Sequence, residues 1–204
     1  MRRSAVFKYL FWLLLALPGA LLVLGYVTRP EDVFPGDYLH PSGVYAARLI
    51  IFVLVLTPLS QLLPGSRIVR WLLRHRRAIG VAAFGYALLH LSFYVLDMET
   101  VENMMAEIGS PGIWTGWLAT LFMLAPAIVS NDRAMRALKG TWKRIQRLAY
   151  PAAILTLVHW ALIHDDLEAA LANFAPLAVL QLIRLIRFVL NRNNQTTTPQ
   201  RSIT

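Results

Sequence analysis

The sequence has no cysteine and little charge, and both shortages narrow what the protein can be. Because none of its 204 residues is a cysteine, the chain forms no disulfide, thiolate metal site, iron–sulfur cluster or cysteine nucleophile. Charged residues make up 15% of it, against about 25% in soluble domains. The sequence also contains no Ser–His–Asp set, phosphate-binding loop or GxGxxG motif. By contrast, 57% of the residues are hydrophobic, which is typical of an integral membrane protein.

The apolar residues gather into six segments, and each approximates the ~17–25 residues that cross a bilayer as a helix. The segments are 7–26, 44–63, 78–96, 113–130, 148–163 and 172–189, of which the fifth is the shortest. The first begins like a signal peptide, but its apolar run continues too far, so we expect a retained helix. We predict an all-α polytopic membrane protein, a six-helix transmembrane bundle in one domain over residues 1–190, with a disordered tail over 191–204.

Charge alternates between successive loops. All basic residues but Arg29 and Arg48 lie at the N-terminus, in loops 64–77 and 131–147, or from residue 184 onward. All acidic residues but Asp132 lie in the other three loops. By the positive-inside rule, this pattern places both termini in the cytoplasm. The net charge of +9 would otherwise favour nucleic acid as a partner, but a nucleic-acid binder has no reason to alternate its charge. The expected partner of the apolar surface is the lipid bilayer.

Two histidines lie at the same calculated depth inside different apolar segments. His90 is 13 residues beyond Arg77, and His159 is 12 residues beyond Arg147, so both lie ~18–20 Å from the charged edge of their segments. The third and fifth helices of a bundle run in the same direction, which makes the two depths equal. Two opposed imidazoles at one level are what a bis-histidine haem iron requires. The alternative is that each histidine only hydrogen bonds to a neighbouring helix or to water.

Other residues near these histidines bear on the cofactor. Small side chains in the third segment would leave room for a flat macrocycle beside the backbone; they are Gly80, Ala82, Ala83, Gly85 and Ala87. Zinc is a poorer candidate, since two imidazoles without a nearby carboxylate make an incomplete zinc site. A bis-histidine iron has no open coordination position, which favours electron transfer over oxygen chemistry.

The inner ends of the third and fifth segments are rich in arginine. Arg76, Arg77, Arg144 and Arg147 anchor the helices at the membrane surface in the simpler interpretation. In the alternative, more specific interpretation, these arginines hold haem propionates, a flavin phosphate or an acidic partner.

Two stretches carry a resemblance to a known family. RHRRAIGVAAFGYALLHLSFYVL (residues 74–96) and WKRIQRLAYPAAILTLVHWAL (residues 142–162) resemble the MsrQ (YedZ) family, haem-binding membrane subunits of periplasmic methionine sulfoxide reductase systems. The resemblance covers about residues 43–162 and extends to the wider ferric-reductase-like transmembrane group. It implies that His90 and His159 are the axial ligands of a haem iron, and it matches Arg76 to a family arginine.

The chain departs from the family at Gln146, where the family usually has a histidine. In relatives with two haems that position would serve the inner haem. Glutamine is a poor iron ligand, which argues against a second haem here. The cofactors that the resemblance implies are therefore one haem b and, as a further candidate, FMN.

The family resemblance also implies a role and partners. Electrons would come from the quinol pool or a cytoplasmic flavin reductase, cross the bacterial inner membrane through the haem, and leave to a periplasmic molybdopterin-containing methionine sulfoxide reductase. The chain would be the electron-transfer subunit of an oxidoreductase complex rather than its catalytic subunit. Two alternatives stay open: a transmembrane ferric-reductase-like oxidoreductase acting on another outer acceptor, and a transporter or scaffold without a cofactor.

Overall fold

The computed structural model describes residues 2–29, 31–164 and 167–196, and over these ranges the chain forms helices and no strand. The elements in chain order are α1 (Arg2–Thr28), the short 3-10 helix η1 (Pro35–Tyr38), α2 (Leu39–Leu62), α3 (Arg67–Met98), α4 (Val101–Glu107), α5 (Pro111–Ile128), α6 (Asp132–Leu138), α7 (Gly140–Gln146), α8 (Ala149–His164) and α9 (Leu167–Thr196).

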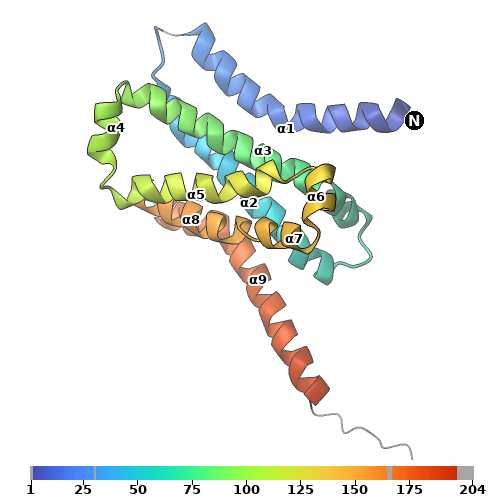
Figure 1. Ribbon diagram of the computed structural model, residues 1–204. Helices are drawn as coiled ribbons and strands as arrows, with labels where there is room; N and C mark the ends of the chain where they lie inside the picture. Colours follow the sequence, from blue (N-terminus) through green and yellow to red (C-terminus); the bar gives the residue numbers. More distant parts are fainter. Residues whose placement is uncertain (1, 30, 165–166, 197–204) are drawn as a thin grey trace, which may run out of the picture.

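Helices α2, α3, α5 and α8 form the core of the molecule, with α3 on α2 and α8 on α5 (Figure 1). Small residues lie where these helices meet: Ala47 and Ala83 are 1% exposed and Ala152 is 0% exposed. Small side chains let helix backbones approach closely, which is the usual way that membrane helices associate. The core therefore consists of two tightly packed helix pairs, and the space between the pairs is where a cofactor can lie.

Within the described residues, five helices are long and apolar enough to cross a membrane, as expected of a helical polytopic membrane protein. The apolar ranges are Val6–Thr28, Pro35–Leu62, Arg67–Met98, Pro111–Ile128 and Leu167–Arg192. The predicted fifth segment, 148–163, forms α8, which has only 16 residues and rises ~24 Å.

Proline explains why α8 is short. Pro151 has no N–H for the carbonyl of Arg147, and the helix is interrupted there: Tyr150 N–H bonds to Arg147 O at 3.0 Å in a tighter turn. The basic residues before the break form the separate helix α7. The arginine-rich stretch before the fifth apolar segment and the segment itself are thus two elements, α7 and α8, rather than one continuous helix.

The two terminal helices lie outside the core. Helix α1 contains Pro18 and bends along its length beside α3 (Figure 1). The first part of α9 packs on α2 and α8, and its later part extends away from the bundle (Figure 1). Helix α9 continues to Thr196, beyond the expected start of the tail at residue 191. Residues 197–204 lie outside the described residues, so their disorder stays a prediction.

The two ends of the bundle differ in charge. Helix α4, with Glu102 and Glu107, lies at one end, and α6 and α7 lie at the other (Figure 1). Asp132, the acid that departs from the charge pattern, forms an ion pair with Arg77 across 2.7 Å. The hydrogen bond and charge of Arg77 hold the pKa of Asp132 below its ordinary value. Asp132, the one acid outside the charge pattern, therefore links α6 to α3 through its ion pair with Arg77.

Candidate cofactor site

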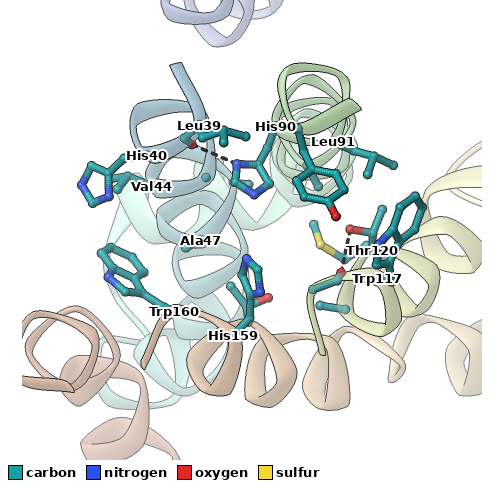
Figure 2. A pocket seen from close by; sticks show the side chains of 18 of the residues that line it. Leu39, His40, Val44, Ala47, His90, Leu91, Trp117, Thr120, His159 and Trp160 are labelled. Carbon is teal, nitrogen blue, oxygen red and sulfur yellow. Dashed lines mark hydrogen bonds between the residues drawn. The ribbon is translucent and has the colours of Figure 1, made fainter. Parts of the chain in front are cut away.

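His90 on α3 and His159 on α8 point toward one another across a cavity between the two helix pairs (Figure 2). The ring centres lie 6.0 Å apart, and the ring planes are 83° to one another. The two residues are 69 positions apart in the sequence, and both their equal depth and the family resemblance predicted that they meet. The structure confirms this juxtaposition, whereas iron binding by the pair stays a prediction at this point.

The cavity around the two rings is lined mostly by apolar and small side chains. Its volume is about 100 Å³, so the helices lie close around the two rings. Gly43, Ala47, Gly116 and Ala119 are among the residues that line it, and indole rings lie at its sides. Among the described residues that line it, none is Lys, Arg, Asp or Glu.

The backbone fixes which nitrogen of each imidazole can bind a metal. His90 Nδ1 donates to the carbonyl oxygen of Leu39 at 2.9 Å, and His159 Nδ1 donates to that of Gly112 at 2.7 Å. Because a carbonyl oxygen can only accept, the ring proton lies on Nδ1 and the lone pair on Nε2. Metal-binding histidines almost always donate their other N–H in this way.

The spacing of the rings fits an iron held on both sides. With nitrogen–metal bonds of about 2 Å and about 1.2 Å from nitrogen to ring centre, two axial imidazoles have centres about 6 Å apart. Within the described ranges, no group of three or more His, Asp or Glu side chains could hold a metal ion by itself. An iron whose other four ligands come from a macrocycle fits this pair better than zinc does.

Most of the small residues of α3 that were expected beside a macrocycle do not lie at the two rings. Of the five small residues predicted to provide it on α3, Ala87 lines this cavity. Gly80 and Ala83 line a different cavity, and Gly85 is exposed. The prediction was wrong for these because α2 and α5, not the earlier turns of α3, face the two rings. Small residues of those two helices line the cavity instead.

A second cavity lies toward the basic end of the bundle and holds the other predicted site residues except Arg144, which is not among its lining residues. Arg76, Arg77, Gln146 and Arg147 line it, and none of them lines the histidine cavity. Its empty volume, including open solvent, is about 1730 Å³. Met123 lines both cavities, so the two are neighbours. Lys143 and Arg184, which the sequence did not single out for this role, also line this inner cavity.

Gln146 acts in this structure as a hydrogen-bond donor between helices. Its side-chain nitrogen donates to the carbonyl oxygen of Pro126 at 3.1 Å and to the hydroxyl of Ser130 at 3.2 Å. These bonds hold α7 against the end of α5. No histidine is among the described residues that line the inner cavity. His75 packs instead between Phe11 and Trp71, with ring-centre distances of 4.9 and 4.4 Å.

A third histidine lies at the histidine cavity and was not predicted there. His40 is in the first turn of α2, lines the cavity, and packs its ring edge-to-face on Trp160 with centres 6.1 Å apart (Figure 2). The sequence placed His40 in a loop, because the helix was expected to begin at residue 44. The helix begins earlier, at Leu39, which brings His40 to the cavity.

Together, the apolar helices and the facing imidazoles define a polytopic membrane protein of the ferric-reductase-like class. Residues 42–157 match the family model described as "Ferric reductase like transmembrane component". The chain is also similar to curated haem-binding subunits MsrQ of protein-methionine-sulfoxide reductase. The identity is 37% to that of Xanthomonas axonopodis pv. citri, over 69% of this chain and 65% of the relative. It is 32% to that of Rhizobium meliloti, over 74% of this chain and 71% of the relative.

The chain belongs to the MsrQ family, as the resemblance predicted. Its match spans 65% of the length of the Xanthomonas relatives, slightly less than two thirds. No solved structure matches the chain.

Proposed function

We propose that the protein is a membrane electron-transfer subunit carrying one haem b between His90 and His159. The observation that carries this proposal is the pair of facing imidazoles. Their ring centres lie 6.0 Å apart, and each Nδ1 donates a hydrogen bond to a backbone carbonyl. The relatives' name, haem-binding subunit MsrQ, supports the same cofactor. The role is that of an electron carrier within an oxidoreductase complex rather than of its catalytic subunit.

The protein's own side chains account for the properties that such a carrier needs. A haem with two axial imidazoles supplies reversible one-electron chemistry with no open coordination position. His90 and His159 bind from helices α3 and α8 of the rigid core, which limits the rearrangement on electron transfer. The apolar lining excludes water and ions. His40 and Trp160 line the cavity, and their rings pack edge-to-face against one another there.

The proposed topology has six membrane spans, which are the five long apolar helices and the shorter α8. The membrane is a bacterial inner membrane, and both termini lie on its cytoplasmic side. The separation of acidic α4 from basic α6 and α7 supports it. In this orientation α4 faces the periplasm. We propose that its acids contribute to the docking face for a periplasmic molybdopterin-containing methionine sulfoxide reductase.

The inner cavity is the proposed side of electron entry, from the quinol pool or a cytoplasmic flavin reductase. Arg76, Arg77 and Arg147 line it with positive charge, which suits the phosphate of an FMN. A second haem does not fit, because Gln146 replaces the family histidine and donates to Pro126 and Ser130. Met123, shared by both cavities, lies between this entrance and the histidines.

The match to the ferric-reductase-like family model favours one alternative, direct reduction of another outer acceptor such as ferric ion. The two functions differ in what reoxidises the reduced protein. The full chain is expressed with ample haem, purified and reduced with a quinol. It is then mixed either with the periplasmic reductase and methionine sulfoxide or with a ferric chelate. Reoxidation that requires the reductase supports the proposal. Equally fast reoxidation by the chelate alone supports the alternative, and a protein without haem absorption contradicts both.

A further inference from the structure

The two histidines rest on matching short segments of different helices. Residues 39–43 of α2 read LHPSG, and residues 112–116 of α5 read GIWTG. In each, the carbonyl of the first residue accepts from an imidazole, a hydroxyl residue follows three positions later, and a glycine follows four positions later. We propose that these segments are equivalent ligand seats, which position His90 and His159 and set how strongly each imidazole donates to iron. This inference rests on the proposed haem function.

The seat on α2 is built around the carbonyl of Leu39. It accepts from His90 Nδ1 at 2.9 Å and from the hydroxyl of Ser42 at 3.0 Å. The same hydroxyl lies 2.6 Å from the carbonyl oxygen of Tyr38 and 3.4 Å from His90 Nδ1. A Cβ atom on Gly43 would lie 3.0 Å from that nitrogen. The imidazole therefore lies directly on the helix backbone.

The seat on α5 repeats this arrangement around the carbonyl of Gly112. It accepts from His159 Nδ1 at 2.7 Å and from the hydroxyl of Thr115 at 2.8 Å. This hydroxyl also reaches the carbonyl of Pro111 at 2.8 Å. A Cβ atom on Gly116 would lie 2.7 Å from His159 Nδ1, closer than real Cβ contacts come. Here too, only glycine leaves space for the ring.

Burial supports a role for the two hydroxyls. Ser42 is 0% exposed and Thr115 is 4% exposed, and they are the two buried polar side chains among those that the structure describes. A helix in an apolar core does not need a hydroxyl to satisfy its own backbone bonds. What the two hydroxyls share is the carbonyl that each histidine uses.

Sharing the carbonyl affects the imidazole in a definite direction. Each hydroxyl shares its single proton between this carbonyl and the preceding one, and that share lessens the pull of the oxygen on the Nδ1 proton. Without the hydroxyl, the carbonyl polarises the imidazole more strongly, and Nε2 becomes the stronger donor. A stronger donor stabilises ferric over ferrous iron. Ser42 and Thr115 are thus positioning residues that raise the reduction potential of the haem.

The test uses the haem-loaded full chain and variants of each hydroxyl. Ser42→Ala and Thr115→Val remove the hydroxyl with little change of shape, and Thr115→Ser keeps it. Ser60→Ala is the matched control on α2, because its hydroxyl bonds to Thr57 O at 2.7 Å, a carbonyl that no histidine uses. The midpoint potential and the low-spin electron paramagnetic resonance signal of each protein are measured.

We expect lower potentials in Ser42→Ala and Thr115→Val, and the parent potential in Thr115→Ser and Ser60→Ala. If the hydroxyl-free variants bind no haem, Thr115→Ser must still bind it with the parent spectrum. Unchanged potentials in haem-loaded Ser42→Ala and Thr115→Val overturn the inference but leave the haem function intact. A parent protein without haem contradicts the function itself, so the two failures are distinguishable.

Discussion

At the scale of single residues, glycines determine where the imidazoles can lie. Gly43 and Gly116 face the rings of His90 and His159, where an added Cβ atom would lie 3.0 Å and 2.7 Å from the nearest ring atom, respectively. Glycines of α3 differ, since an added Cβ at Gly85 meets no atom within 4 Å. The sequence alone could not separate these roles, because all of them are glycines in apolar helices and the partner of each depends on helix packing.

We expect Gly116→Ala to displace His159 and to lower haem content strongly, because the added Cβ would lie 2.7 Å from two ring atoms. Gly43→Ala should have a smaller effect, since its closest contact is 3.0 Å. Haem absorbance per protein measures both. Gly85→Ala is the control and should keep the parent value, with stability equal or higher because alanine favours a helix by about 1 kcal/mol. Equal haem content in all three variants would contradict the geometry.

Gln146→Ala is expected to keep the haem and to lose stability. The variant removes two hydrogen bonds, to Pro126 and Ser130, each worth roughly 0.5–1.5 kcal/mol. Thermal unfolding in detergent measures the loss, and the haem-to-protein ratio should stay at the parent value. A ratio that falls as far as in a histidine variant would mean that Gln146 serves the cofactor directly.

At the scale of helices, a tyrosine modifies the backbone of its neighbour. Tyr86 of α3 accepts from the N–H of Gly19 at 2.8 Å and donates to the carbonyl of Leu15 at 2.8 Å. Those two groups would normally bond to each other in α1, so the hydroxyl is inserted into the helix ladder. Such insertions, like prolines, bend helices, and Pro18 is adjacent. The bend in α1 (Figure 1) follows from both residues.

Tyr86→Phe should therefore loosen α1 from the bundle. The variant removes both bonds of a tyrosine that is 5% exposed, at a cost of roughly 1–3 kcal/mol. Faster amide hydrogen exchange at Gly19 and a lower unfolding temperature are the expected readings. Tyr9→Phe is the control, because Tyr9 lies on α1, the helix that contains Gly19, and is 72% exposed. Unchanged exchange at Gly19 would show that the hydroxyl does not hold the two helices together.

Helix positions were largely predictable from apolar runs, but helix ends were not. The six apolar segments correspond to α1, α2, α3, α5, α8 and α9. The early start of α2 at Leu39 was missed, since His40 and Pro41 look like loop residues, and a proline is tolerated in the first turn of a helix. The separate helix α7 was missed because a proline can also lie inside a continuous membrane helix, as Pro18 and Pro58 do in α1 and α2.

At the scale of the whole molecule, the alternation of charge and the equal depth of two histidines were readable from the sequence. The structure places acidic α4 and basic α6 and α7 at opposite ends (Figure 1). The division into two cavities was not readable. One of the interpretations had the arginines hold the propionates of the haem between the histidines, but the two sets of residues line neighbouring cavities that have Met123 in common.

The absence of cysteine makes the proposed orientation directly measurable. Single cysteines introduced at Met105 in α4, which is 57% exposed, and at Gly65 or Arg133 at the other end report on opposite sides of the membrane. A membrane-impermeant maleimide added to spheroplasts should label Met105→Cys at once. It should label Gly65→Cys and Arg133→Cys only after permeabilisation. The reverse pattern would contradict cytoplasmic termini and a periplasmic α4.

The most direct test of the central claim is the absorption spectrum of the purified full chain, expressed with ample haem, beside its His90→Ala, His159→Ala and Gln146→Ala variants. The account predicts a Soret band and a low-spin signal with about one haem per chain, as for a bis-imidazole iron. It predicts loss of both in either histidine variant and their retention in Gln146→Ala. A parent protein without a Soret band, or histidine variants that keep the low-spin haem, would contradict it.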